Sequence, residues 1–185
     1  MMPELSLNIL DVAQNSVTAG SKLVIIDIEA DTVADKLLIT VTDDGCGMTG
    51  EQASRVTDPF YTTRTTRRVG LGIPFLKMAC ELTGGSLSIN SAPSAGTTIS
   101  ASFTLSHIDR MPLGDIAGTF TALAGPSPDI DFLLRYSVDG RSFSADTREF
   151  REILGDVALN EPQVLDFING YISENREECD AGASI

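Results

Sequence analysis

The chain has 185 residues, of which 42% are hydrophobic and 21% charged, values typical of globular proteins that argue against wholesale disorder. Its 13 basic and 26 acidic side chains give a net charge of −13, so nucleic-acid phosphates and anionic membrane surfaces would repel it. The cysteines show no CxxC spacing, and no stretch approaches the roughly 20 apolar residues of a membrane span. We therefore expect a cytoplasmic protein with neither nucleic acid nor membrane as a partner.

The first hundred residues alternate between helical and extended patterns. Leu5, Ile9, Val12 and Ser16 recur at helical spacing and predict a helix that Gly20 ends. The remaining patterns of this part predict strands at KLVIIDIEA and KLLITVTDD, a loop from Asp43 to Val69, a helix at GLGIPFLKMACEL, and strands at SLSINSA and TTISASFTL. This order predicts an α/β (α+β) fold, a two-layer sandwich with helices on one face of a mixed sheet.

The composition changes where Pro112 and two glycines interrupt the pattern, and we predict a boundary at residues 106–112. Residues 1–105 carry 7 basic and 11 acidic side chains, net −4, whereas residues 106–185 carry 6 and 15, net −9. We therefore divide the chain into a first domain, residues 1–105, and a small acidic C-terminal region, residues 106–185.

The C-terminal region has patterns of its own. Asp139–Gly140 is a strong hairpin signal between the runs DFLLRYSV and RSFSAD. Thr147 is expected to cap a helix that runs through Leu159, and Pro162 to begin a second helix. These patterns predict a small α+β extension made of a hairpin and two helices.

The first helix also carries a polar stripe formed by Asn8, Asp11, Asn15 and Thr18, at positions i, i+3, i+7 and i+10. Such a stripe is commonly a solvated surface. A functional alternative rests on Asp11 and Asn15, which lie one turn apart. A carboxylate there could activate a nucleophile while the neighbouring amide holds a hydrated Mg²⁺. Both interpretations remain open at this point.

One glycine-containing segment follows a predicted strand, and another precedes a different predicted strand. DDGCGM, residues 43–48, directly follows a strand, where two glycines allow close approach to a flat ligand and a carboxylate can accept from an exocyclic amine. Gly96–Thr97 precedes the last strand of the first part. Each pattern alone is also explained by an ordinary turn.

A third glycine pattern, Gly70-Leu71-Gly72, opens a helix, and the free N–H groups of such an end favour phosphate. Arg64, together with two further arginines at positions 67 and 68, lies just before it. A solvated loop explains these charges, and so does the neutralisation of a triphosphate.

Taken together and in this order, the segments resemble the ATP-binding domain of the GHKL superfamily, which contains DNA gyrase, the large heat-shock chaperone, sensor histidine kinases and mismatch-repair MutL. DVAQNSVTAGS resembles the N box and DDGCGM the first glycine box. DPFYTTR resembles the phenylalanine box and VGLGIPFLK the second glycine box. SAGTT resembles the final glycine–threonine box. The resemblance covers residues 4–105 and is closest to the nitrogen-regulator type of sensor kinase. It implies a histidine kinase-like ATP-binding fold with ATP and Mg²⁺ as ligands.

The resemblance also implies individual roles. Asn15 would be the Mg²⁺ ligand, Asp44 the acceptor for the adenine amino group, and Asp11, where the superfamily often has Glu, the general base. The other residues implied in nucleotide binding are Gly45, Gly47 and Met48 at the adenine, Thr97 beside the base, and Gly70, Leu71 and Gly72 at the phosphates. Residues 61–69 would form a mobile lid, with Arg64 as its basic catalytic residue.

Two departures bear on function. Thr18 stands where sensor kinases often have Lys, and the N box begins within the first dozen residues, so we expect no phosphoacceptor histidine domain. The single histidine, His107, follows the last strand of the first domain and is expected to be a boundary residue.

We therefore expect a Mg-ATP-binding, histidine kinase-like ATPase or kinase subunit that acts on, or regulates, a partner protein in two-component-type signal transduction. The alternative is an ATP-dependent regulatory module without phosphoryl transfer. A DNA-remodelling ATPase is a third alternative, which the acidity of the chain disfavours. Homodimerisation stays open, as do the partner and the phosphoacceptor.

Overall fold

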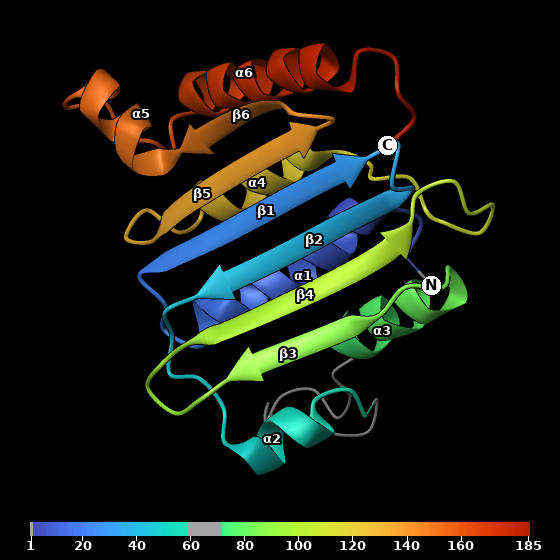
Figure 1. The fold of residues 1–185 in the computed structure, drawn as a ribbon. Helices are drawn as coiled ribbons and strands as arrows, with labels where there is room; N and C mark the ends of the chain where they lie inside the picture. The colour runs from blue at the N-terminus through green and yellow to red at the C-terminus, as the bar shows by residue number, and fades with distance from the viewer. Residues whose placement is uncertain (1, 59–71) are drawn as a thin grey trace.

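A single mixed sheet organises the described chain (Figure 1). The computed structural model describes residues 2–58 and 72–185. Within these ranges six strands join in the order β3-β4-β2-β1-β5-β6. The strands are β1 (Leu23–Asp31), β2 (Lys36–Asp43), β3 (Leu87–Ser91), β4 (Thr97–Thr104), β5 (Asp131–Val138) and β6 (Arg141–Asp146). The predicted mixed sheet with α/β layering is thereby confirmed.

Alternation along the strands gives the sheet two different faces. In β2, Leu37, Ile39 and Val41 are buried, whereas the residues between them are only partly covered. The partly covered face is rich in hydroxyl side chains: Thr40 pairs with Ser100 across β2 and β4, and their hydroxyls lie 3.2 Å apart. The helices therefore have one apolar sheet face to cover.

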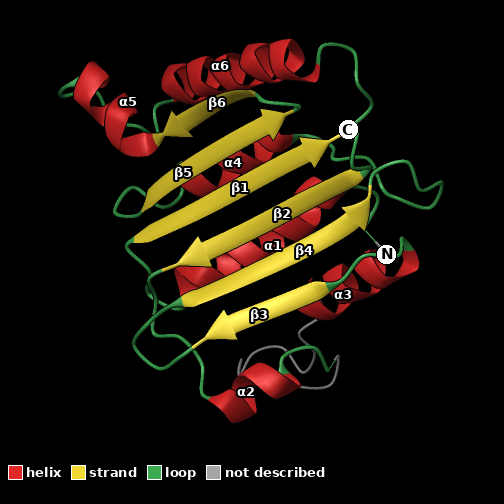
Figure 2. Cartoon of the chain, viewed as in Figure 1, coloured by secondary structure: helices red, strands yellow, loops and turns green. Residues whose placement is uncertain are grey.

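Helices α1 (Leu5–Thr18), α3 (Gly72–Leu82) and α4 (Ile116–Ala124) pack against the apolar face (Figure 2). The central one, α1, contacts both α3 and α4, and it buries the predicted apolar stripe of Leu5, Ile9, Val12 and Ser16. This position places the opposite, polar side of α1 near the beginning of α3.

Two short helices depart from the predicted pattern. The predicted loop after β2 contains α2 (Gly50–Arg55), which a capping box of Thr49 and Gln52 begins. Helix α4 lies in the region that we predict as an interruption, and the Asp115 side chain caps it by accepting the Gly118 N–H at 2.8 Å. Both capping signals are present in the sequence, but the flanking glycines conceal them.

The predicted C-terminal hairpin and its two helices are present. Asp139 and Gly140 both have positive φ, 50° and 83°, as the tight turn between β5 and β6 requires. Helices α5 (Thr147–Leu154) and α6 (Pro162–Asp180) follow. Helix α5 ends five residues before the predicted Leu159 because Gly155 turns the chain at a φ of 59°.

The predicted cap of α5 needs correction. Its N-cap is Asp146, whose carboxylate accepts the Arg148 N–H at 2.9 Å. The Thr147 hydroxyl instead accepts the Phe132 N–H, also at 2.9 Å, and so ties the helix start to β5. Thr147 is therefore a buried link between the helix and the sheet.

The C-terminal region completes the sheet of the first region. Strand β5 pairs parallel with β1, with Leu23 opposite Asp131 and Ala30 opposite Val138. Helix α6 contacts α4, β5 and β6, and buries Ile168 and Ile172. The ranges 1–105 and 106–185 consequently share one sheet and one hydrophobic core. Among the described helices, none combines the length and the apolar character needed to span a bilayer.

Candidate functional site

The polar side of α1 meets the beginning of α3 at Asp11. Gly72, the first residue of α3, lies so close that a Cβ atom there would overlap the Asp11 carboxylate. A side chain at position 72 would therefore have to displace the Asp11 carboxylate. The carboxylate thus lies at a helix N-terminus, where the helix dipole favours negative charge.

The other members of the predicted polar stripe have different environments. Asn15 is half-buried one turn beyond Asp11, whereas Thr18 is exposed and donates its hydroxyl to the Gln14 carbonyl at 2.9 Å. Asn8 is only 1% exposed, so the stripe is not a uniformly solvated surface. Its Oδ1 atom has no hydrogen-bond partner among the described residues.

Asp43 and Asp44, two consecutive aspartates at the end of β2, have different surroundings. Asp44 is exposed, and its Oδ1 accepts the backbone N–H groups of Lys22 and Leu23 at 2.7 and 3.0 Å. Desolvation raises the pKa of this carboxyl, but the hydrogen bonds from Leu23 and Lys22 outweigh it, so the pKa lies below its ordinary value. Asp44 is thus held at the start of β1.

Asp43 lies between α1 and the sheet. It is 9% exposed; its Oδ2 accepts the Ser16 hydroxyl at 2.7 Å and its Oδ1 accepts the Gly45 N–H at 2.9 Å. In the sheet it stands opposite Thr97 of β4. The family resemblance in the sequence singles out Asp44 rather than Asp43. Strand alternation nevertheless predicts the orientation of Asp43, because Val41 is buried and position 43 lies on the same face of the strand.

Two glycines near this end of the sheet pack tightly against backbone carbonyl groups. Gly47 has a φ of 65°, and a Cβ there would overlap the carbonyl oxygen of Ala92. Gly96 has a φ of 75°, and a Cβ there would overlap the carbonyl oxygen of Asp43 itself. Both positions therefore exclude side chains, for reasons of backbone conformation and of space.

Ser91 links the predicted base-proximal residues, and sequence reasoning did not single it out. Its Oγ accepts the Met48 N–H at 2.8 Å, donates to the Gly96 carbonyl at 2.9 Å and lies 2.9 Å from the Thr97 hydroxyl. Met48 and Thr97 are thus brought to the same end of the sheet as Asp43.

The loop between Asp43 and Met48 is also fastened to α1. The Cys46 N–H donates to the Ala19 carbonyl at 3.0 Å, and a Cβ at Gly45 would lie 2.9 Å from the Ala19 side chain. Of the predicted site residues, Asp11, Asn15, Gly45, Gly47, Met48, Gly72 and Thr97 lie along α1 and the adjoining strand and helix ends. Arg64, Gly70, Leu71 and the predicted lid at 61–69 lie outside the described residues.

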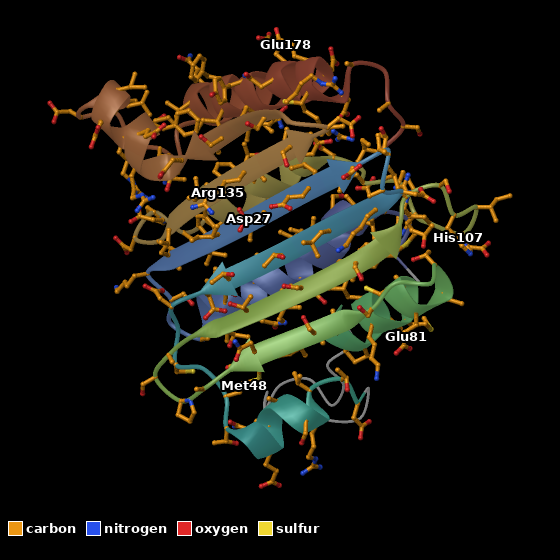
Figure 3. All side chains as sticks on the ribbon, in the orientation of Figure 1. Asp27, Met48, Glu81, His107, Arg135 and Glu178 are labelled. Carbon is orange, nitrogen blue, oxygen red and sulfur yellow. The ribbon has the colours of Figure 1, made fainter. Side chains whose placement is uncertain are left out.

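Lys77 and His107 have other surroundings. Lys77 is at 3.9 Å from Glu81 in an exposed ion pair on α3. His107 lies at the opposite end of the sheet from Met48 (Figure 3), where its Nδ1 accepts the Asp109 N–H at 3.1 Å.

Comparison with known proteins adds a family match. Residues 2–107 match the family described as histidine kinase-, DNA gyrase B- and HSP90-like ATPase. The chain is 31% identical over 150 residues to probable histidine kinase 5 of Oryza sativa subsp. japonica, covering 78% of this chain and 12% of that protein. It is 34% identical over 68 residues to the nitrogen regulation protein NtrY of Azorhizobium caulinodans, covering 37% of this chain and 9% of the relative.

Among solved structures, the MutL ATPase domain of Aquifex aeolicus complexed with ADP superposes with a TM-score of 0.52 at 13% identity. The match covers 83% of this chain and 70% of the MutL chain. At this identity the likeness concerns the fold, and it extends beyond residue 107 into the C-terminal region. The chain spans only about an eighth or less of the two curated relatives described above.

Proposed function

Because the chain belongs to the histidine kinase-, DNA gyrase B- and HSP90-like ATPase family, we propose that it binds Mg-ATP between α1, the start of α3 and the β2–β4 end of the sheet. With it, the chain acts on or regulates a partner protein in cytoplasmic signalling. The observation that carries this proposal is the buried carboxylate of Asp43, which accepts hydrogen bonds from Ser16 of α1 and from the Gly45 N–H.

Asp43, in place of the predicted Asp44, is proposed to accept the adenine amino group. Each of its oxygens accepts one hydrogen bond from the protein, from Ser16 or from Gly45. A carboxylate oxygen has two lone pairs, so capacity remains for an amine. Gly47 packs against the Ala92 and Gly96 carbonyls near this strand end, and Ser91 joins Met48 and Thr97 there. These features fit a planar base.

The oxygen atoms on the polar side of α1 fit the metal and the phosphates. The Asn15 amide and the Asp11 carboxylate are hard oxygen donors of the kind that Mg²⁺ prefers. We propose that Asn15 ligates Mg²⁺, with Gly72 at the phosphates together with Gly70 and Leu71. Bound ATP supplies the phosphoryl group, and Mg²⁺ neutralises charge on its phosphates.

Asp11 is proposed to act as general base. Its carboxylate lies one helical turn from Asn15 and against the first residue of α3, so a proton acceptor stands beside the proposed metal and phosphate positions. It would accept the proton from an attacking water or from the hydroxyl or imidazole of a partner. We propose that the Arg64 guanidinium stabilises negative charge on the transferred phosphoryl group.

The signalling role draws on the relatives, one named a histidine kinase and the other a nitrogen regulation protein. Phosphoryl transfer to a partner is our first proposal. Regulation by binding alone, without transfer, is the alternative. Incubation of the chain and candidate partner proteins with ATP radiolabelled at the γ-phosphate separates the two, because only transfer leaves the label on a partner.

The decisive experiment compares two adjacent substitutions by calorimetric titration with Mg-ATP. We expect Asp43→Asn to weaken ATP binding at least about tenfold, because an amide presents a donor to the adenine amine. Asp44→Asn serves as the matched control and should stay within about twofold, since its carboxylate holds the start of β1. Melting temperatures of both variants establish that they are folded.

A nucleotide lacking the 6-amino group sharpens the same test. Purine riboside triphosphate should bind the wild-type chain at least about tenfold more weakly than ATP, and Asp43→Asn should abolish this difference. If Asp44→Asn removes the discrimination and Asp43→Asn keeps it, the adenine assignment returns to Asp44. If neither variant binds ATP differently from the wild type, the proposed site is wrong.

A further inference from the structure

Exposed apolar side chains concentrate at the junction of α5 and α6. Ile153 is 79% exposed, Val157 49% and Phe167 62%. Seven large hydrophobic residues are exposed in the described ranges, and these three fall within a stretch of 15 residues. Contiguous exposed apolar surface is typical of a binding site, whereas isolated exposed residues need no explanation.

The same junction contains a hollow of about 630 Å³. Its apolar lining comes from Val157, Ala158, Pro162 and Val164, and its carboxylates from Asp156 and Glu161. Phe167 lies one helical turn beyond Val164 on α6. We call Ile153, Phe167 and the residues of this hollow the α5–α6 surface.

Charge around the α5–α6 surface is strongly one-sided. The three arginines of these helices are all engaged within the chain: Arg148 with Asp146, Arg151 with Asp131, and Arg176 with Asp180. By contrast, five carboxylates in or near the hollow form no ion pair within the described ranges. Asp156 and Glu161 line the hollow, and Glu149, Glu152 and Asp166 lie close to it in sequence.

We propose that the α5–α6 surface docks a basic amphipathic segment of a partner protein. An apolar side chain of that segment enters the hollow beside Val157 and Val164, while its Lys or Arg side chains neutralise Asp156 and Glu161. Apolar anchors provide most of the binding energy in such contacts, and charge complementarity provides orientation and rate.

The charge pattern also selects among occupants. A second copy of the chain would bring the same unpaired carboxylates against each other, and like charges across an interface are strongly unfavourable. The docking surface lies along the β6 edge of the sheet, whereas the proposed nucleotide site lies at α1 and β2 (Figure 1). Docking can therefore be measured without nucleotide, and its failure is distinguishable from failure of ATP binding.

The test uses the full chain and a fluorescein-labelled amphipathic helix-forming peptide of about 16 Leu and Lys residues, followed by fluorescence anisotropy. Phe167→Ser and Val157→Ser should each weaken binding at least about fivefold. Val33→Ser and Ile108→Ser, at residues 94% and 95% exposed elsewhere on the chain, are matched controls that should stay within about twofold.

A charge-matched pair tests the other half of the proposal. Asp156→Asn combined with Glu161→Gln should weaken binding at least about fivefold and reduce its salt dependence. Glu177→Gln combined with Glu178→Gln removes two exposed charges from the far end of α6 and should change binding by less than about twofold (Figure 3).

Several results would overturn the inference. Absence of peptide binding, or an equal loss in the control variants, would show that no defined surface is involved. Equal binding of a peptide with Glu in place of Lys would remove the basic partner. A dimer in sedimentation velocity that Phe167→Ser dissociates would assign the surface to self-association instead.

Discussion

Asp11 is the residue at which nucleotide binding and turnover should separate. It lies against Gly72, yet the proposed metal ligand is Asn15. Asp11→Asn keeps the shape and removes the proton acceptor, so we expect ATP affinity to change by less than about threefold and turnover to fall about 10²–10⁴-fold. Calorimetry and a phosphate-release assay measure the two quantities. Unchanged turnover would leave Asp11 as a structural partner of α3.

We expect Asn8 to destabilise the folded state. Its Oδ1 is buried without a hydrogen-bond partner among the described residues. Its Nδ2 donates a long hydrogen bond, 3.4 Å, to the Glu4 carbonyl. Asn8→Leu removes the unsatisfied acceptor and keeps the branched shape and the number of side-chain heavy atoms, so we expect the free energy of unfolding to rise by about 1 kcal/mol in urea titration. A fall of similar size would mean that a water or ligand satisfies Oδ1 in solution.

The cysteines should react unequally because their surroundings differ. Cys46 is exposed in the loop beside the proposed base position, whereas Cys80 and Cys179 are buried. Burial raises the pKa of Cys80 to about 12, which leaves roughly 10⁻⁴ of it as thiolate at pH 8. Desolvation and then Asp180 raise the pKa of Cys179 as well.

We therefore expect N-ethylmaleimide to modify one thiol per native chain rapidly, at Cys46, as peptide mass spectrometry will locate. Mg-ATP should slow this reaction by restricting the loop that contains Gly45 and Gly47. Rapid labelling of Cys80 in the folded chain would contradict the described packing of α3.

At the residue scale, the sequence predicts the composition of the site better than its orientation. The N box and glycine motifs direct attention to Asp11, Asn15 and the loop after β2, which the structure places near helix and strand ends. They do not decide between Asp43 and Asp44, because that choice depends on which face of β2 the strand presents to α1. Ser91 escapes notice because its role is a set of tertiary hydrogen bonds.

At the level of elements, α4 offers a clear test of capping. The Asp115 carboxylate accepts the Gly118 N–H, and the helix buries Phe120 and Leu123 against the core. Asp115→Ala should lower the free energy of unfolding by about 1 kcal/mol, as loss of an N-cap usually does. The exposed Asp129→Ala, beyond the end of α4, is the control and should have little effect. Equal stability of the two variants would show that packing alone fixes α4.

The elements that the sequence predicts well are those with uninterrupted periodicity, such as α1, β1 and β2. The ones it misses, α2 and α4, are short and begin beside glycines, so their local signals are weak and tertiary packing decides them. The premature end of α5 has the same origin, because Gly155 adopts a backbone conformation that the apolar pattern does not reveal.

For the whole molecule, the shared sheet has a consequence for dissection. A fragment of residues 1–105 would lose the β5 partner of β1 and uncover apolar residues of α1 that face α4. We expect the full chain to unfold in one transition, and the fragment to be partly unfolded or aggregated, as circular dichroism and size-exclusion chromatography will reveal. A monomeric fragment with full ATP affinity would show instead that the first range is self-sufficient.

The parallel pairing of β1 with β5 also means that β1 is synthesised well before its partner strand. Leu23 pairs with Asp131, which a ribosome adds 108 residues later, about 5–20 s at ordinary rates of synthesis. Throughout that interval β1 would present an unpaired edge, the kind of surface on which nascent chains stick to one another. Asp27, Glu29 and Asp31 occur at every second position of this strand. Their repulsion between neighbouring copies would protect the growing chain until its last strands emerge.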